Sequence, residues 1–264
     1  MQTFRTYEMI VRSKSRFCPS SAAKTTILLS VVFFFALFAG DAAAQRRFSK
    51  SYPAGQTVRL QLMNRTGTVT VIGWNRAEIN ITADLEAPAA IIVPQNLSGT
   101  IVINLVRDNQ GKEVGSVNFT VRVPYTSQVD IETRIGNLSV TNIRSGLVRA
   151  RISSEGDITL TNIEATAVSA ENTMGDILFD GVIEEGGNYR FSSMSGNINI
   201  RIPFNSSFRV VATAPSTRNI SFGSCANPNM SFLGDGRRIV GKCGEGSATM
   251  NATNQRGTIK FLSR

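Results

Sequence analysis

The most regular feature of the sequence is a glycine followed by a polar residue and then by alternating apolar and mostly polar positions. Six copies occur: GTVTV from Gly67, GNLSV from Gly136, GDITL from Gly156, GDILF from Gly175, GNINI from Gly196 and GTIKF from Gly257. The four central glycines are 20, 19 and 21 residues apart. Alternation with a period of two is typical of a strand with one buried face, so a strand is expected after each glycine.

A second alternating pair of apolar residues precedes each glycine at a nearly constant distance. These pairs are Leu60/Leu62, Val129/Ile131, Val148/Ala150, Val168/Ala170, Tyr189/Phe191 and Met250/Ala252. The unit of Gly156 has one extra residue here, which predicts a β-bulge or a longer corner. Glycine suits a corner that needs a positive φ or a close backbone approach, and Asn142 and Asn162 are expected at the opposite corner.

A unit of about 20 residues cannot bury its apolar face alone, whereas stacked units share one continuous core. The sequence therefore predicts an all-β fold, a parallel β-helix-like solenoid of ~20-residue two-strand coils. Charge supports this stacking: Arg149 would lie beside Asp130, and Arg151 between Glu132 and Glu171. Opposite charges on adjacent strands stabilise a sheet modestly.

Less regular segments flank these repeats. The regular repeats occupy residues 126–204, and 55–125 hold irregular alternating strands that are expected to pair in part antiparallel. Within them, Asp108-Asn109-Gln110-Gly111 predicts a hairpin turn. Residues 205–264 contain a degenerate repeat, with Arg218 at the glycine position, and a cysteine-bracketed insertion.

The N-terminal segment predicts export. Residues 27–40 form the apolar run ILLSVVFFFALFAG, which follows five basic residues and precedes an Ala-rich stretch ending at Ala44. This order is typical of a signal peptide, here residues 1–44, and the run is shorter than the ~20 residues of a spanning helix. Residues 45–264 are then a single secreted, periplasmic or cell-envelope domain without a transmembrane segment. A retained anchor and a start at Met9 rather than Met1 remain alternatives.

Two cysteines, Cys225 and Cys243, follow the expected cleavage site. An even number in an exported chain predicts one disulfide, and closing its 17-residue loop is worth about 3 kcal/mol on the loop-entropy estimate. The Gly-rich segments 234–236 and 241–244 match no phosphate-binding motif and predict loops. The chain has no histidine, which argues against a zinc site and against His-dependent nucleophilic catalysis.

The charge of the chain is positive but dispersed. Residues 1–44 carry five basic and two acidic side chains, so residues 45–264 carry +6 of the total net charge of +9. The basic residues are not clustered among aromatic ones, which argues against nucleic-acid binding. Most are expected on a solvated surface, and Arg149, Arg151 and Arg190 are weak candidates for binding.

Two sets of residues suggest chemistry. Asp157 and Asp176 occupy equivalent corners of adjacent units, and paired carboxylates can share a proton or hold calcium. The same column continues as Asn137 and Asn197, which favours ordinary turn chemistry instead. Trp74, with Tyr52, Tyr125 and Tyr189, could stack on sugar rings, although the large apolar area of Trp74 favours packing at the edge of the core instead.

Several motifs resemble a known bacterial family. GTVTVIGWN from Gly67, VPY from Val123, the GNL, GDI and GNI units and IPF from Ile202 are similar to an exported β-strand-repeat family of unknown function with adhesin-like members. The resemblance covers roughly residues 50–264 and implies a right-handed parallel β-helix-like solenoid of the cell envelope. It implies no site residues and no cofactor.

Together these observations predict a non-enzymatic, adhesin-like binding or structural scaffold without a cofactor. Its partner is unknown, with an envelope polysaccharide or protein as the candidates, and its oligomeric state is left open. The alternative is a polysaccharide-degrading β-helix enzyme that uses Asp157 and Asp176 with calcium.

Overall fold

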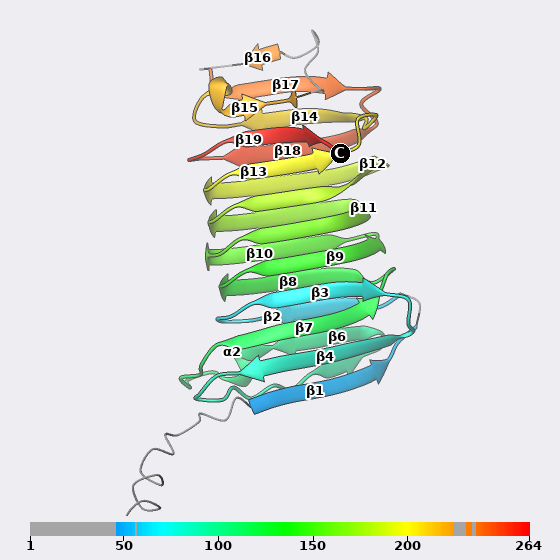
Figure 1. The fold of residues 1–264 in the computed structure, drawn as a ribbon, viewed down its shortest axis with the longest axis vertical. Coiled ribbons are helices and arrows are strands. Elements are labelled where there is room, and N and C mark those ends of the chain that lie inside the picture. The colour runs from blue at the N-terminus through cyan, green and yellow to red at the C-terminus, as the bar shows by residue number, and fades with distance from the viewer. Residues whose placement is uncertain (1–45, 56, 224–230, 234–235) are drawn as a thin grey trace, which may run out of the picture. The chain divides into compact units, whose positions relative to one another are not determined.

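Two strands and two corners make up each coil of the central part of the chain in the computed structural model (Figure 1). The structure describes residues 46–55, 57–223, 231–233 and 236–264, which belong to one compact unit, Gln45–Arg264. The central strands are β8 (Gln128–Ile135), β9 (Leu138–Ser145), β10 (Val148–Glu155), β11 (Ile158–Met174), β12 (Ile177–Ser195) and β13 (Ile198–Ile202).

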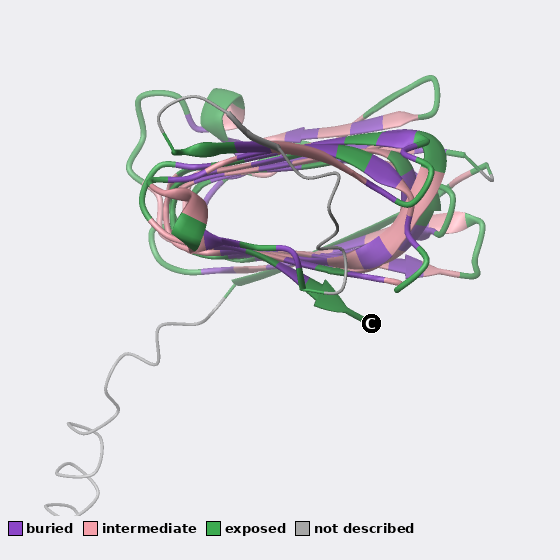
Figure 2. Cartoon of the chain, turned by 90° about the horizontal axis from the view of Figure 1, so that it is seen from above, coloured by how far each residue is buried: buried purple, intermediate pink, exposed green. Residues whose placement is uncertain are grey.

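Neighbouring coils pair in parallel and in the register that the repeats predict. One buried column of the first face consists of Leu60, Val129, Val148, Val168, Tyr189 and Met250. The register shift between Ile152 and Glu155 confirms the bulge expected in the Gly156 unit. Seen along the stack, two long faces enclose the core (Figure 2). The fold is therefore all-β, with its apolar residues facing inward between the two faces.

The glycine corner has both properties expected of it. The φ angles of Gly67, Gly136, Gly156, Gly175, Gly196 and Gly257 lie between +114° and +148°. A Cβ atom on Gly175 would overlap the carbonyl oxygen of Gly156, one coil away. Only glycine satisfies both conditions without strain.

The opposite corner uses asparagine, as predicted. Asn142 and Asn162 have φ angles of +59° and +54°. The side-chain amide of Asn162 donates to the Asn142 Oδ1 atom at 2.8 Å, so these two side chains link adjacent coils.

A column of buried polar residues lines the inner side of the glycine corner and was not predicted. Its members stand three residues before a glycine of the corner: Asn64, Thr133, Asn172, Ser193 and Asn254. The Asn172 amide donates to the carbonyl oxygens of Gly156 at 3.2 Å and Gly175 at 2.8 Å. These bonds satisfy carbonyl groups that the corner leaves unpaired inside the core.

The N-terminal part contains β1 (Arg46–Pro53), β2 (Arg59–Met63), β3 (Val69–Trp74), β4 (Glu78–Leu85), β5 (Gln95–Leu97), β6 (Thr100–Asn104), α2 (Leu105–Asp108) and β7 (Val117–Pro124). Antiparallel pairing is confirmed for β4 with β1 and β7, and for β5 with β6. The hairpin predicted at residues 108–111 is wrong, because β6 pairs with β2 and β7 with β3, on different faces. The turn residues carry the chain around a corner, and turn chemistry alone does not decide which strands pair.

The C-terminal part contains β14 (Phe208–Thr213), the 3₁₀ turn η1 (Thr217–Asn219), β15 (Ile220–Ser221), β16 (Ser231–Leu233), β17 (Arg238–Cys243), β18 (Ala248–Asn254) and β19 (Ile259–Ser263). The loop predicted at 241–244 is wrong for residues 241–243, which lie in β17. This strand pairs antiparallel with β14, whose backbone groups would otherwise form an open edge. Arg218, at the expected glycine position, lies in η1.

The order of the coils in space departs from their order in the sequence at both ends. The coil of β2 and β3 lies between the coil of β6 and β7 and the coil of β8 and β9. Likewise, the coil of β18 and β19 lies between β12 and β13 on one side and β14 and β15 on the other. The first and last coils of the sequence are thus each covered by a neighbouring segment of the chain (Figure 1).

Within the described part of the chain, no helix is long and apolar enough to cross a membrane.

Candidate functional site

The predicted carboxylate pair lies on adjacent coils, and its oxygens have structural partners. The Asp157 Oδ1 atom accepts the backbone N–H of Asp176 at 2.7 Å, and the Asp176 Oδ1 atom accepts that of Asn197 at 2.7 Å. Asn137 precedes them in the same way by accepting the N–H of Asp157 at 2.9 Å. Both carboxylates are exposed. Each therefore caps the amide of the next coil, as does a neutral asparagine in the same column.

The described residues also offer little for a metal ion near this pair. No group of three or more Cys, Asp or Glu side chains with suitable spacing occurs within residues 46–264 outside the undescribed gaps.

The arginine candidates follow the predicted columns. Arg149 donates to both carboxylate oxygens of Asp130, at 2.8 and 2.9 Å. Arg151 is in register with Glu132 and Glu171. This bidentate pair uses the Nε and one Nη donor of Arg149, so the side chain serves mainly to join β10 to β8.

Arg190 is exposed on the same face. It borders a shallow polar hollow together with Glu171, Ser192, Asn251 and Thr253. Because Glu171 supplies a negative charge beside it, this hollow is a weak site for anions.

The aromatic candidates divide into structural and accessible residues. Tyr189 is fully buried, its hydroxyl donates to the Ala165 carbonyl at 2.8 Å, and burial raises its pKa to about 12. Tyr52 packs partly against the core. Trp74 and Tyr125, by contrast, line the same cleft, and 38% of Tyr125 is exposed. The structure therefore brings together two aromatic residues that are 51 positions apart in the sequence.

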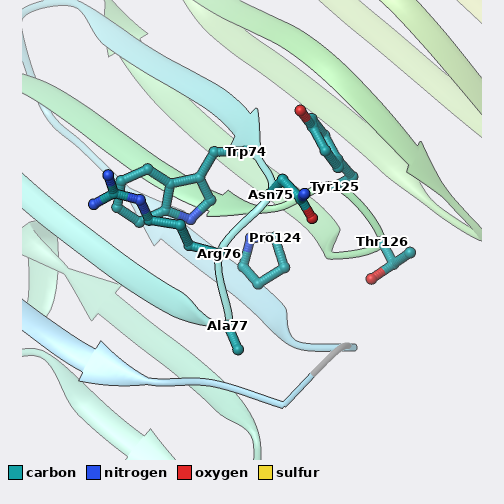
Figure 3. Close-up of a pocket in the computed structure, with 7 residues that line it drawn as sticks. All are labelled: Trp74, Asn75, Arg76, Ala77, Pro124, Tyr125 and Thr126. Carbon is teal, nitrogen blue, oxygen red and sulfur yellow. The ribbon is translucent and has the colours of Figure 1, made fainter.

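This cleft has a volume of about 340 Å³ and opens outward at the ends of β3 and β7 (Figure 3). Its lining residues are Trp74, Asn75, Arg76, Ala77, Pro124, Tyr125 and Thr126. Arg76 is the charged member of this set, and Pro124 forms a buried apolar part of the wall.

The cleft forms because two connections cross here. From Trp74 the chain leaves the coil of β3 towards β4, whereas from Pro124 it passes this coil to reach β8. The N–H of Tyr125 donates to the Trp74 carbonyl at 3.2 Å, and the Tyr125 carbonyl accepts the N–H of Arg144 at 2.8 Å. The backbone of Tyr125 thus links the Trp74 carbonyl to the Arg144 N–H at this corner.

Local contacts fix the orientation of Trp74. Its indole N–H donates to the Glu78 carbonyl oxygen at 2.8 Å. The Arg76 guanidinium lies over the ring, 5.0 Å from its centroid, in cation–π geometry. Gly73, directly before the tryptophan, approaches the Asn142 carbonyl so closely that a Cβ atom would overlap it. The wall of the cleft is accordingly held by backbone contacts and not by side-chain packing alone.

The sequence contained a signal for this crossing. Val123-Pro124-Tyr125-Thr126-Ser127 and Ile202-Pro203-Phe204-Asn205-Ser206 share a Pro-aromatic-polar-Ser pattern. In both, the serine N–H donates to the proline carbonyl, at 3.0 and 3.1 Å. Both turns begin where the chain passes a neighbouring coil, so the repeated pattern marks the two crossings. Asn75 and Arg76 were not identified from the sequence.

Of the two cysteines predicted to form a disulfide, Cys225 lies outside the described residues. Cys243 is buried at the end of β17, opposite Phe208 of β14. The disulfide stays a prediction, as does the signal peptide at residues 1–44, which also lie outside the described part.

Residues 45–261 match the Toastrack DUF4097 family. The chain belongs to this family. The resemblance inferred from the GTVTVIGWN, VPY and IPF motifs is confirmed to that extent, and the Toastrack match spans both crossings and all six corner glycines. No curated protein matches this Toastrack chain.

Solved structures resemble the Toastrack chain at low sequence identity. A candidate cell adhesion protein from Clostridium sporogenes is 11% identical, with a TM-score of 0.47, over 83% of this chain and 100% of that chain. A candidate adhesin from Bacteroides fragilis is 11% identical, with a TM-score of 0.30, over 84% and 99%. A candidate lipid-binding protein from Parabacteroides distasonis is 8% identical, with a TM-score of 0.34, over 83% and 98%.

Proposed function

We propose that this Toastrack protein is an exported, adhesin-like β-solenoid that binds a partner in the cell envelope or outside the cell and does not catalyse a reaction. The parallel register of β8 to β13 supports the solenoid assignment, because equivalent residues of successive coils form columns. Such a stack presents a long and rigid outer surface. The predicted signal peptide supports export.

The observation that carries the binding role is the cleft between Trp74 and Tyr125. Small-molecule sites are concave, with apolar walls and a few placed polar groups. This cleft has that composition, and it opens on the outside of the stack.

The alternative of a polysaccharide-degrading enzyme depends on Asp157 and Asp176. Acid-base or nucleophilic work needs carboxylates directed at a substrate. Here one oxygen of each carboxylate accepts a backbone N–H of the next coil, which favours a structural role for the pair.

One experiment separates the two functions. The purified protein is incubated with a panel of acidic and neutral polysaccharides and envelope proteins, with and without calcium, while retention and new chain ends are recorded. We expect retention without cleavage, unchanged in the Asp157→Asn, Asp176→Asn double variant. Cleavage that disappears in the double variant would establish the enzyme instead, and retention on no member of the panel would refute the binding role.

A further inference from the structure

The cleft of the N-terminal crossing combines an aromatic surface with an available positive charge. Trp74 and Tyr125 are both partly accessible, and Tyr125 stands on the opposite side of the opening from Trp74 (Figure 3). The C–H faces of sugar rings pack against aromatic rings, whereas their hydroxyl groups need polar partners at the rim. Asn75 and Thr126 are the uncharged polar residues that line the cleft.

Arg76 differs from the surface arginines that are paired with carboxylates. Arg149 is paired with Asp130, Arg144 with Glu164, and Arg201 and Arg264 both with Asp180. Among the residues that the structure describes, Arg76 has the Trp74 ring as its partner and no carboxylate within 4.0 Å. An exposed guanidinium stacked on an indole keeps its outward N–H groups for a ligand.

The charge of the lining favours an anionic ligand. Arg76 is the one charged side chain among the seven residues that line the cleft, and no acidic side chain opposes it there. A guanidinium binds carboxylate and sulfate groups through paired, charge-assisted hydrogen bonds. At about 340 Å³ the cleft lies at the small end of the ~300–1,000 Å³ range of ligand pockets, a size suited to one or two sugar rings.

We infer that this cleft binds an anionic sugar unit of a polysaccharide. The ring packs against Trp74 and Tyr125, and Arg76 binds the carboxylate or sulfate group. This inference rests on the proposed binding function and adds to it the class of ligand and the residues that recognise it.

The test measures the affinity of the purified protein for uronate-containing oligosaccharides, for sulfated ones and for the neutral oligosaccharides of matching length. Arg76→Gln is expected to weaken anionic binding by at least about tenfold and to change neutral binding little. Comparing the uronate and sulfated series identifies which anionic group is preferred.

Two matched pairs of variants separate binding in the cleft from general attraction to the surface. Arg190→Gln is the control for Arg76→Gln, and Phe204→Ala is the control for Tyr125→Ala. Arg190→Gln removes the same charge from an exposed arginine outside the cleft, and it should leave the affinity within about twofold. Tyr125→Ala should weaken binding of every sugar that the cleft accepts, by about tenfold. Phe204→Ala removes an aromatic residue that is 74% exposed in the matching turn, and it should have no effect.

The outcomes also separate this inference from the proposed function. Equal losses for Arg76→Gln and Arg190→Gln would overturn the site and indicate non-specific attraction. Retention of a neutral polysaccharide or an envelope protein, unaffected by the cleft variants, would overturn the site while preserving the binding function. Absence of every form of retention would overturn both.

Discussion

The centre and the ends of the stack differ in how the sequence order relates to the order in space. From the coil of Gly136 to the coil of Gly196, coils that follow one another in the sequence are also neighbours in space. At each end, a coil from inside the sequence covers the first or the last repeat, and further antiparallel strands lie beyond that coil. The repeat motif therefore specifies the conformation of a coil, whereas the segments that connect the coils decide which coils lie next to each other in the stack.

The two crossings that produce this rearrangement also differ from each other. Both use a Pro-aromatic-polar-Ser turn, and in both the aromatic residue, Tyr125 or Phe204, is exposed. The first turn runs beside the loop of Trp74 and Arg76, whereas the second runs beside β19, where Arg264 donates its N–H to the Ile202 carbonyl at 2.9 Å. The loop of Trp74 and Arg76 forms the second wall of the cleft. The turn at Tyr125 therefore borders a cleft because this loop lies beside it.

The largest expected effect concerns the central glycine corner. Gly175→Val places a branched side chain at φ = +124° and against the Gly156 carbonyl, and we expect the free energy of unfolding to fall by more than about 3 kcal/mol. Urea unfolding measures this loss. Gly186→Val is the control, because Gly186 has φ = +70° but open space around its Cβ position, and its loss should be clearly smaller. Equal losses would mean that φ alone, and not the contact between coils, sets the requirement.

Hydrogen exchange tests the difference between centre and ends directly. Hydrogen exchange reports the free energy of local opening. Because β18 and β19 are paired on both sides, we expect the opening free energy of their amides to be close to that of β12 amides and about 2 kcal/mol above that of β15 amides. If exchange instead becomes faster steadily towards the C-terminus of the sequence, the covered position of the last repeat does not protect it.

The buried polar column should contribute a smaller amount per residue. Asn172→Ala removes the donor to the Gly156 and Gly175 carbonyls and leaves them unpaired in the core, at a cost of about 2 kcal/mol. Thermal or urea unfolding of this variant can be compared with that of Asn251→Ala, on the outer surface of β18. An unchanged stability in Asn172→Ala would show that water replaces the amide.

The carboxylate column should be the least sensitive. Asp157→Asn keeps the Oδ1 acceptor of the Asp176 N–H, so the stability should change by less than about 0.5 kcal/mol. Asp157→Ala removes the acceptor and should cost about 1 kcal/mol. A larger effect of the asparagine variant would mean that the negative charge itself matters in this column.

The sequence allowed the coil to be predicted closely, because its determinants are local. Alternation identified the buried columns, the spacing of the repeats predicted their register, and the pairing of Arg149 with Asp130 agrees with that register. The hairpin at residues 108–111 and the loop at 241–243 were wrong because strand pairing depends on which distant edge is available, as when β14 pairs with β17. For the site, Trp74 and Tyr125 could be named from the sequence as aromatic candidates. That they line one cleft depends on the crossing of the two connections, and the position of Arg76 beside them follows from the same crossing.

The covered ends have a consequence for how proteins with this fold can change in length. A duplicated coil placed between Gly136 and Gly196 would pair with its neighbours on both sides and leave each crossing as it is. A repeat duplicated beyond the first or the last motif would find the adjoining position in the stack already occupied, by residues 100–124 or 208–221. Growth by repeat duplication is thus confined to the middle of the chain, and the cleft keeps its place at one end whatever the number of coils.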